Sequence, residues 1–185
     1  MITCEQLYPL ARRIFWGYVF LLFNFSLTLN DTFALHLLPN TLGWFLLARA
    51  AGEGASLRPS LKLLVPLCLG LAVWNVQQFV PTLSAQIPSV LSLLASVVSL
   101  YAHFQLLTDL AALADQTLPG SGHGDRLRSA RTVVVVIQTI AFCSDLFLRL
   151  PELGVILVLA VFFVNLYILA QLWALCKALA PSRAP

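Results

Sequence analysis

The chain has 185 residues, of which 59% are hydrophobic and only 10% are charged, and its mean hydropathy is +0.88. Soluble domains carry about a quarter charged residues, so this composition excludes an ordinary soluble enzyme domain and indicates an integral membrane protein. The net charge of +3 is too small and too dispersed to indicate nucleic-acid binding.

Uncharged apolar stretches predict an all-α fold, a polytopic bundle of transmembrane helices. The length suits about six helices of ~20 residues each, in one integral membrane domain over residues 1–185. The six predicted spans are Ile14–Leu29, Thr32–Leu47, Leu63–Val80, Ser89–Leu107, Thr132–Leu148 and Leu153–Leu175. Short connections between alternate spans predict three antiparallel hairpins.

The second predicted span is interrupted midway by Pro39 and Asn40. A re-entrant half-helix is the alternative. If the segment crosses and the N-terminus is inside, ten of the eleven Lys and Arg residues are cytoplasmic and only Arg149 is outside. If it does not cross, only three remain inside, against the positive-inside rule. The charges therefore favour six spans with both termini cytoplasmic.

Residues 108–131 form the longest predicted connection, a flexible cytoplasmic loop. It contains the turn-forming run Pro119-Gly120-Ser121-Gly122-His123-Gly124. A phosphate-cradling loop is the alternative, but no strand precedes the run and no Gly-Lys-Ser/Thr follows. We interpret it as a linker.

Polar residues near the predicted outer ends of several spans could form a small vestibule. Ionisable groups in spans are costly and are candidates for function by default. The residues are Asn24, Asp31, Asn75, Gln77, Gln138, Asp145 and Arg149. Asp145 and Arg149 are four apart, the spacing of a helical ion pair. The vestibule would attract a cation or hold a polar solute; alternatively, these groups simply lie solvated at headgroup level.

The fourth predicted span carries a stripe of small polar residues on one helical face. Ser92, Ser96, Ser99 and His103 recur at helical spacing, and Asn165 in the sixth span is a candidate partner. Serine allows close helix packing and hydrogen bonding in lipid, so a packing seam is one interpretation. The other is one wall of a solute path in which His103 handles protons.

A local resemblance to a protein family lies within the second predicted span. The stretch Leu37-Leu38-Pro39-Asn40-Thr41-Leu42-Gly43-Trp44 resembles a Leu-Leu-Pro-Asp-x-x-Gly-Tyr pattern of small uncharacterised multi-span membrane proteins of Gram-positive bacteria. Asn40 replaces the aspartate and Trp44 the tyrosine of that pattern. The resemblance implies a bacterial inner-membrane protein, and it implies no substrate and no catalytic residue.

These patterns lead to two functional hypotheses. The first is a permease-like or channel-like protein for a small polar or cationic solute. The second is a membrane scaffold or accessory subunit that packs against a partner membrane protein or a second copy. We expect no enzyme activity and no cofactor or metal, because His-Glu-x-x-His and Gly-x-Ser-x-Gly are absent from the sequence. The four cysteines, Cys4, Cys68, Cys143 and Cys176, are expected to be buried thiols.

Overall fold

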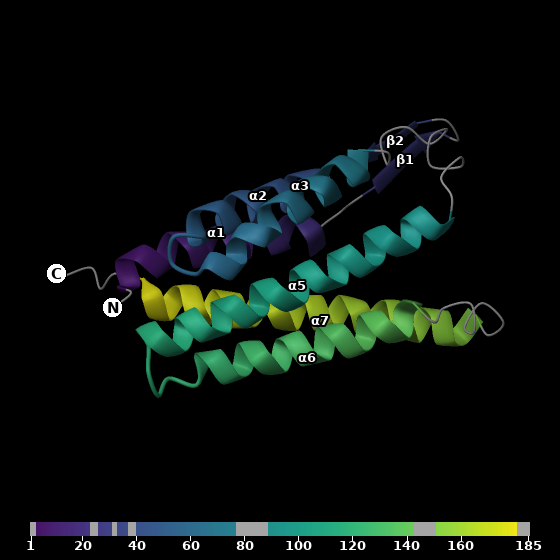
Figure 1. Cartoon of the computed structure of the whole chain (residues 1–185). Coiled ribbons are helices and arrows are strands. Elements are labelled where there is room, and N and C mark those ends of the chain that lie inside the picture. Colours follow the sequence, from purple (N-terminus) through teal and green to yellow (C-terminus); the bar gives the residue numbers. More distant parts are fainter. Residues whose placement is uncertain are drawn as a thin grey trace. The chain divides into compact units, whose positions relative to one another are not determined.

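The computed structural model describes residues 3–22, 26–30, 33–36, 40–76, 89–142 and 151–180 (Figure 1). The described chain is helical apart from one β-hairpin, so the prediction of a predominantly helical fold is confirmed. The chain divides into two compact units. One is Arg12–Ala102, and the other combines Met1–Ala11 with His103–Pro185.

Helices α1, α2 and α3 provide most of the helical structure of the Arg12–Ala102 unit. Their bounds are Cys4–Leu22, Asn40–Gly54 and Leu64–Asn75, and a short 3₁₀ helix η1 at Pro59–Leu63 precedes α3. Helices α2 and α3 lie side by side as a hairpin (Figure 1). Pro59 begins η1, where its missing amide hydrogen costs no intrahelical bond.

Helices α1 and α2 cross at two glycines that leave no room for a side chain. A Cβ atom on Gly17 would lie 2.6 Å from Cδ2 of Leu47, and one on Gly43 would lie 3.0 Å from the carbonyl oxygen of Gly17. Both distances are shorter than an ordinary van der Waals contact. Gly43 is the glycine of the Leu-Leu-Pro-Asn-x-x-Gly-Trp stretch, and the following Trp44 is buried. That stretch therefore includes a close helix crossing.

A β-hairpin occupies part of the region where the sequence predicts the first two spans. Strand β1 at Ser26–Asn30 pairs antiparallel with β2 at Phe33–His36. The predicted helices over 14–29 and 32–47 are therefore wrong in these two segments. Helix α1 ends at Leu22, and α2 begins only at Asn40, directly after Pro39. Proline disfavours helix at the residue before it, and Thr and Phe suit strands, which accounts for the difference.

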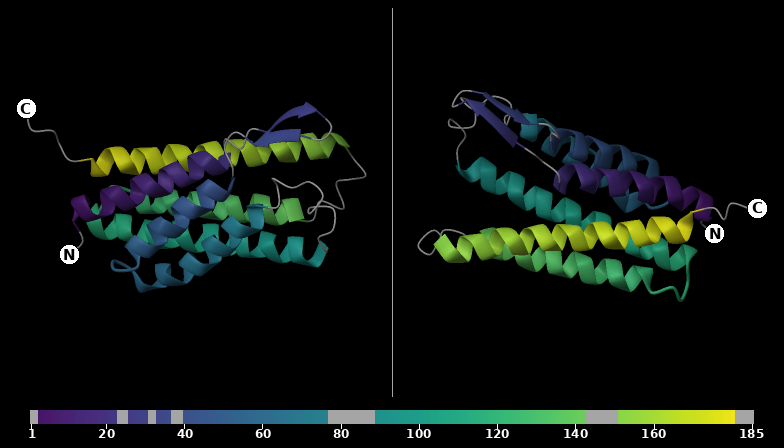
Figure 2. Two further views of the ribbon diagram at one scale, coloured as in Figure 1. Left: turned by 90° about the horizontal axis from the view of Figure 1, so that it is seen from above. Right: turned by 180° about the vertical axis from the view of Figure 1, so that it is seen from behind.

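Helices α5, α6 and α7 complete the described chain, with bounds Ser89–Thr117, His123–Phe142 and Pro151–Leu179. Helix α5 begins in the Arg12–Ala102 unit and continues into the unit that contains His103–Pro185. Helices α6 and α7 lie side by side and antiparallel (Figures 1 and 2). The predicted flexible loop over 108–131 is mostly wrong, because α5 runs to Thr117 and α6 starts at His123. Good helix formers, Ala-Ala-Leu-Ala-Asp-Gln, extend α5 past the predicted span.

Two described helices are long and apolar enough to cross a membrane. They are α5 and, within α7, Ile156–Leu179. Their outer faces are apolar: Val90, Leu94, Val158 and Phe163 are all more than half exposed. Among the cysteines, Cys68 is buried as expected and Cys176 is half-buried, but Cys4 is exposed because it begins α1. Cys143 lies outside the described residues.

Candidate functional site

Most of the predicted vestibule lies outside the described residues. Asn24, Asp31, Gln77, Asp145 and Arg149 belong to that part of the chain. The two described members, Asn75 and Gln138, lie in different compact units. Their assembly into one vestibule therefore stays a prediction.

The two described vestibule residues have different hydrogen-bonding environments. Asn75 is buried, and its Nδ2 donates to the carbonyl oxygen of Leu71 at 2.7 Å. The Oε1 atom of Gln138 is buried, and no donor among the described residues reaches it. A buried amide oxygen without a donor is costly, so of the two described vestibule residues Gln138 is the better suited to accept a hydrogen bond from another molecule.

The polar stripe of the fourth predicted span lies on α5 and changes in exposure along the helix. Ser92 is exposed, Ser96 and Ser99 are half-buried, and His103 is buried. The hydroxyl of Ser96 donates to the carbonyl oxygen of Ser92 at 2.9 Å. Such bonds to the preceding turn satisfy a hydroxyl inside its own helix.

Asn165, the candidate partner of the stripe, follows the same pattern on α7. Its Nδ2 donates to the carbonyl oxygen of Val161, one turn earlier, at 2.8 Å. Together with Ser96 and Asn75, it is a third polar side chain of an apolar helix that bonds to its own backbone. This is the arrangement expected where water is scarce, because each donor otherwise loses a partner on leaving water.

The Arg12–Ala102 unit carries an apolar groove between α3 and the first half of α5. Its volume is about 270 Å³. It is lined by Pro66, Leu67, Gly70, Leu71, Trp74, Leu91, Leu94, Ala95 and Val98. Ala95 precedes Ser96 of the polar stripe. The groove offers a surface for apolar side chains or acyl chains and no row of polar groups for a solute.

A second groove in the same unit follows α2 and α3 and has a volume of about 340 Å³. It is apolar for most of its length, and Arg49 and Glu53 mark its charged end. Arg13 of α1 forms an ion pair with Glu53, and Nε of Arg49 lies 3.4 Å from the same carboxylate. One glutamate thus joins α1 to α2.

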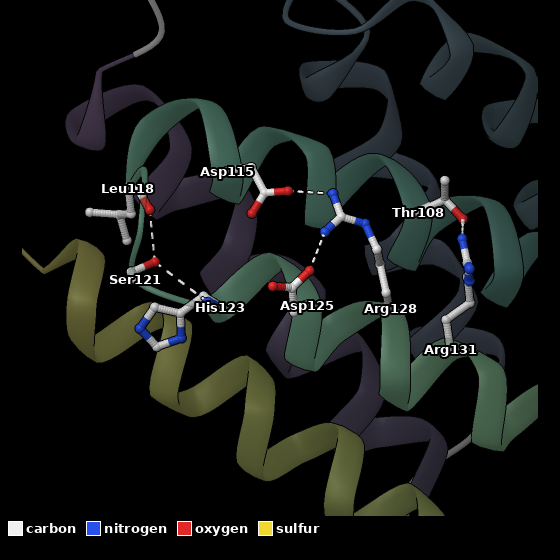
Figure 3. A network of polar contacts seen from close by, with 8 residues as sticks. All are labelled: Thr108, Asp115, Leu118, Ser121, His123, Asp125, Arg128 and Arg131. Atoms are coloured by element: carbon white, nitrogen blue, oxygen red, sulfur yellow. Dashed lines mark hydrogen bonds and ion pairs between the residues drawn. The ribbon is translucent and has the colours of Figure 1, made fainter.

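The most extensive polar network described lies where α5 meets α6 (Figure 3). The guanidinium of Arg128 on α6 donates to Asp115 of α5 and, at 2.7 Å, to Asp125 one turn earlier on α6. The hydrogen bond to Asp115, helped by the charge of Asp125, raises the pKa of Arg128 above its ordinary value. Arg128 therefore stays charged throughout the physiological pH range.

The turn between α5 and α6 brings these charges together. Gly120 and Gly122 adopt positive φ angles of 77° and 72°, which other residues rarely adopt. Ser121 donates its hydroxyl to the carbonyl oxygen of Leu118 at 2.8 Å, and its oxygen accepts the amide of His123 at 3.4 Å (Figure 3). This turn of five residues fixes the register in which Asp115 faces Arg128.

Arg131, one turn further along α6, has a different environment. Its Nη1 donates to the hydroxyl of Thr108 at 3.0 Å (Figure 3), and its guanidinium carbon lies 4.7 Å from the centre of the Phe104 ring. Sequence reasoning missed both arginine environments because it treated residues 108–131 as a loop. The spacing of Asp125 and Arg128, three apart, was the available signal.

Within the described ranges, no three His, Cys, Asp or Glu side chains come together as a metal site. Comparison with protein-family models, with curated proteins and with solved structures finds no match to this chain. The functional argument therefore depends on the geometry of the chain itself.

Proposed function

We propose that the chain is a multi-pass protein of the inner, cytoplasmic membrane with six spans and both termini inside. Helices α5 and α7 have 29 residues each, which corresponds to about 44 Å and exceeds a hydrocarbon core of about 30 Å. Their long uncharged stretches support this topology, which would put ten of the eleven Lys and Arg residues on the cytoplasmic side, as the positive-inside rule favours.

Within that membrane, we propose that the protein acts as a scaffold or accessory subunit that packs against helices of a partner or a second copy. The carrying observation is that Ser96, Asn75 and Asn165 donate to their own helices. Both described grooves are mainly apolar as well. Small residues beside an apolar groove suit close helix packing in lipid.

Cysteine cross-linking in membranes tests this role. The variant Ser92→Cys, in a background without the four native cysteines, places one thiol on the exposed end of the stripe. Leu93→Cys is the matched control, because it is exposed on the same helix but points about 100° away. We expect oxidation to give one discrete adduct with Ser92→Cys and none with Leu93→Cys. Equal or absent cross-linking of both variants would contradict a packing seam.

Solute movement is the second candidate function, and the buried, unpartnered Oε1 of Gln138 favours it. A passing polar solute or cation could interact with this oxygen. Uptake of rubidium ions into proteoliposomes measures such movement. In this hypothesis Gln138→Leu and Asp145→Asn reduce uptake although the protein inserts normally. Uptake no greater than that of empty liposomes, or unchanged by both substitutions, would contradict this role for a cation.

A further inference from the structure

The guanidinium of Arg131 is held in position by α5, and no carboxylate among the described residues pairs with it. Thr108 and Phe104, one turn apart on α5, contact its guanidinium from the same side. The hydroxyl of Thr108 donates to the carbonyl oxygen of Phe104 at 2.7 Å, so its lone pair is left to accept from Arg131. These contacts hold the guanidinium in one orientation, and Thr108 acts as a positioning residue.

The nearby acidic groups are engaged with other residues. Asp115 and Asp125 bind Arg128, and Asp109 accepts a hydrogen bond from Gln105 at 3.0 Å. No acidic side chain among the described residues contacts Arg131, and its Nε has no acceptor there. A guanidinium has five N–H donors, of which one reaches a described oxygen. The Nε atom is itself buried, so a ligand would bind at the terminal Nη atoms, and no described carboxylate pairs with the charge of Arg131.

The position of Arg131 along α6 indicates what could balance this charge. Every charged residue of the described α6 lies between Asp125 and Arg131, and residues 132–142 carry no charge. The uncharged segment includes the exposed residues Val133, Val136 and Ile140. Arg131 is thus the last charge before a lipid-compatible surface, a level at which arginines meet headgroups.

We propose that Arg131 binds the phosphate of an anionic phospholipid, whose acyl chains extend along the uncharged residues 132–142 of α6. Arginine matches phosphate oxygens with two parallel N–H donors, and such charge-assisted bonds are stronger than neutral ones. The inference rests on the proposed membrane placement. It is independent of the packing role tested at Ser92, so failure of one leaves the other intact.

Lipid binding to the purified full-length protein tests the proposal. Native mass spectrometry in a non-ionic detergent would titrate short-chain phosphatidylglycerol, short-chain phosphatidylcholine and inorganic phosphate. We expect phosphatidylglycerol to bind most tightly. We expect Arg131→Gln to weaken it about tenfold or more, as for loss of a charged hydrogen-bonding partner. Thr108→Val should weaken it less, because it removes only the positioning contact.

Arg126→Gln is the matched control, since it removes an exposed arginine of the same helix that has no described side-chain partner. Equal weakening by Arg126→Gln and Arg131→Gln would overturn the proposal in favour of diffuse attraction. Tight binding of inorganic phosphate alone would overturn it in favour of a soluble anion. No preference for phosphatidylglycerol by the wild type would also overturn it. If Arg131→Gln fails to fold, Arg131→Lys keeps the charge but loses the paired donors, and unchanged affinity would again overturn the proposal.

Discussion

Arg128 and Arg131 show how neighbouring residues of one type acquire different roles. They lie one turn apart on α6, yet Arg128 binds two carboxylates while Arg131 contacts a hydroxyl and an aromatic ring. The difference arises because α5 places Asp115 beside Arg128, but Thr108 and Phe104 beside Arg131. Arg128 therefore joins two helices, and Arg131 keeps its charge available.

A double-mutant cycle measures the contribution of the ion pair between Asp115 and Arg128. We expect Asp115→Asn and Arg128→Gln each to lower the thermal unfolding temperature in detergent. The double variant should lower the unfolding temperature by less than the sum of the two single decreases, because the two residues share one interaction. The coupling should shrink in 1 M salt, where charges are screened within about 3 Å.

Asp125→Asn is the control for this cycle. The Asp125 side chain is 84% exposed, against 41% for Asp115. Because exposed ion pairs contribute little to stability, we expect Asp125→Asn to lower the unfolding temperature less than Asp115→Asn does. Additive effects of Asp115→Asn and Arg128→Gln would show that the pair does not stabilise the hairpin.

At the scale of elements, the crossing of α1 and α2 depends on two residues without side chains. Gly17 and Gly43 let the backbones approach until a Cβ atom would meet the facing helix. Close approach of this kind supplies van der Waals packing, which is the main source of helix association in lipid. The crossing and the Arg13–Glu53 ion pair lie along the same two helices.

Substitution of the crossing glycine gives the second prediction. Gly43→Ala should destabilise the protein by about 1–3 kcal/mol, because the new methyl group overlaps the Leu21 side chain and the Gly17 carbonyl oxygen. The free energy of unfolding in a denaturing detergent series measures this effect. Gly70→Ala is the control, since a Cβ there meets nothing within 4 Å. It should be neutral or stabilising by up to about 1 kcal/mol, because alanine favours helix. Similar destabilisation by both would contradict a tight crossing.

The helix ends show where sequence reasoning succeeds and where it does not. The cores of α5 and α7 follow from long uncharged runs, which have few stable alternatives to helix. The end of α5 at Thr117 was missed because a charge was taken as the end of the helix, although charged helices continue readily outside lipid. The strands at 26–36 were missed because apolar runs of this length suit helix and strand alike.

At the scale of the whole molecule, the topology is the proposal with the widest consequences. It rests on the length of the helices and on the positive-inside rule, which assigns most Lys and Arg residues to the cytoplasmic side. Described charged residues gather at few places along the chain: Glu5 to Arg13, Arg49 to Lys62, Asp109 to Arg131, Glu152, and Lys177.

Labelling of single cysteines tests the topology. In a background lacking the four native cysteines, we expect Ser56→Cys and Ser121→Cys to react with an impermeant maleimide only from the cytoplasmic side. Ser84→Cys should react only from the other side. Ser56 and Ser121 are exposed in turns, so the reagent can reach them. Labelling of Ser56 and Ser121 from opposite sides would contradict six spans.

The candidate site was less predictable than the helices. The stripe on α5 follows from serines at helical spacing on a single element, and one helix fixes their common face. The pairing of Asp115 with Arg128 joins residues 13 apart on two helices, and it depends on a turn whose geometry is set by Gly120 and Gly122. Spacing along one helix cannot reveal a contact that a turn creates.

The ion pairs of the α5–α6 hairpin also bear on the order of events during biogenesis. Residues 103–131 contain three arginines and three aspartates. In the proposed topology, the arginines act during insertion, before α5 and α6 pack, as signals that retain this segment in the cytoplasm, and aspartates counteract them little. After packing, the charge of Arg128 is paired with the carboxylates of Asp115 and Asp125. Arg128 thus contributes first to the topogenic signal and later to the ion pairs that join α5 to α6. A substitution of Arg128 should therefore affect insertion and folded stability at different times in the life of the protein.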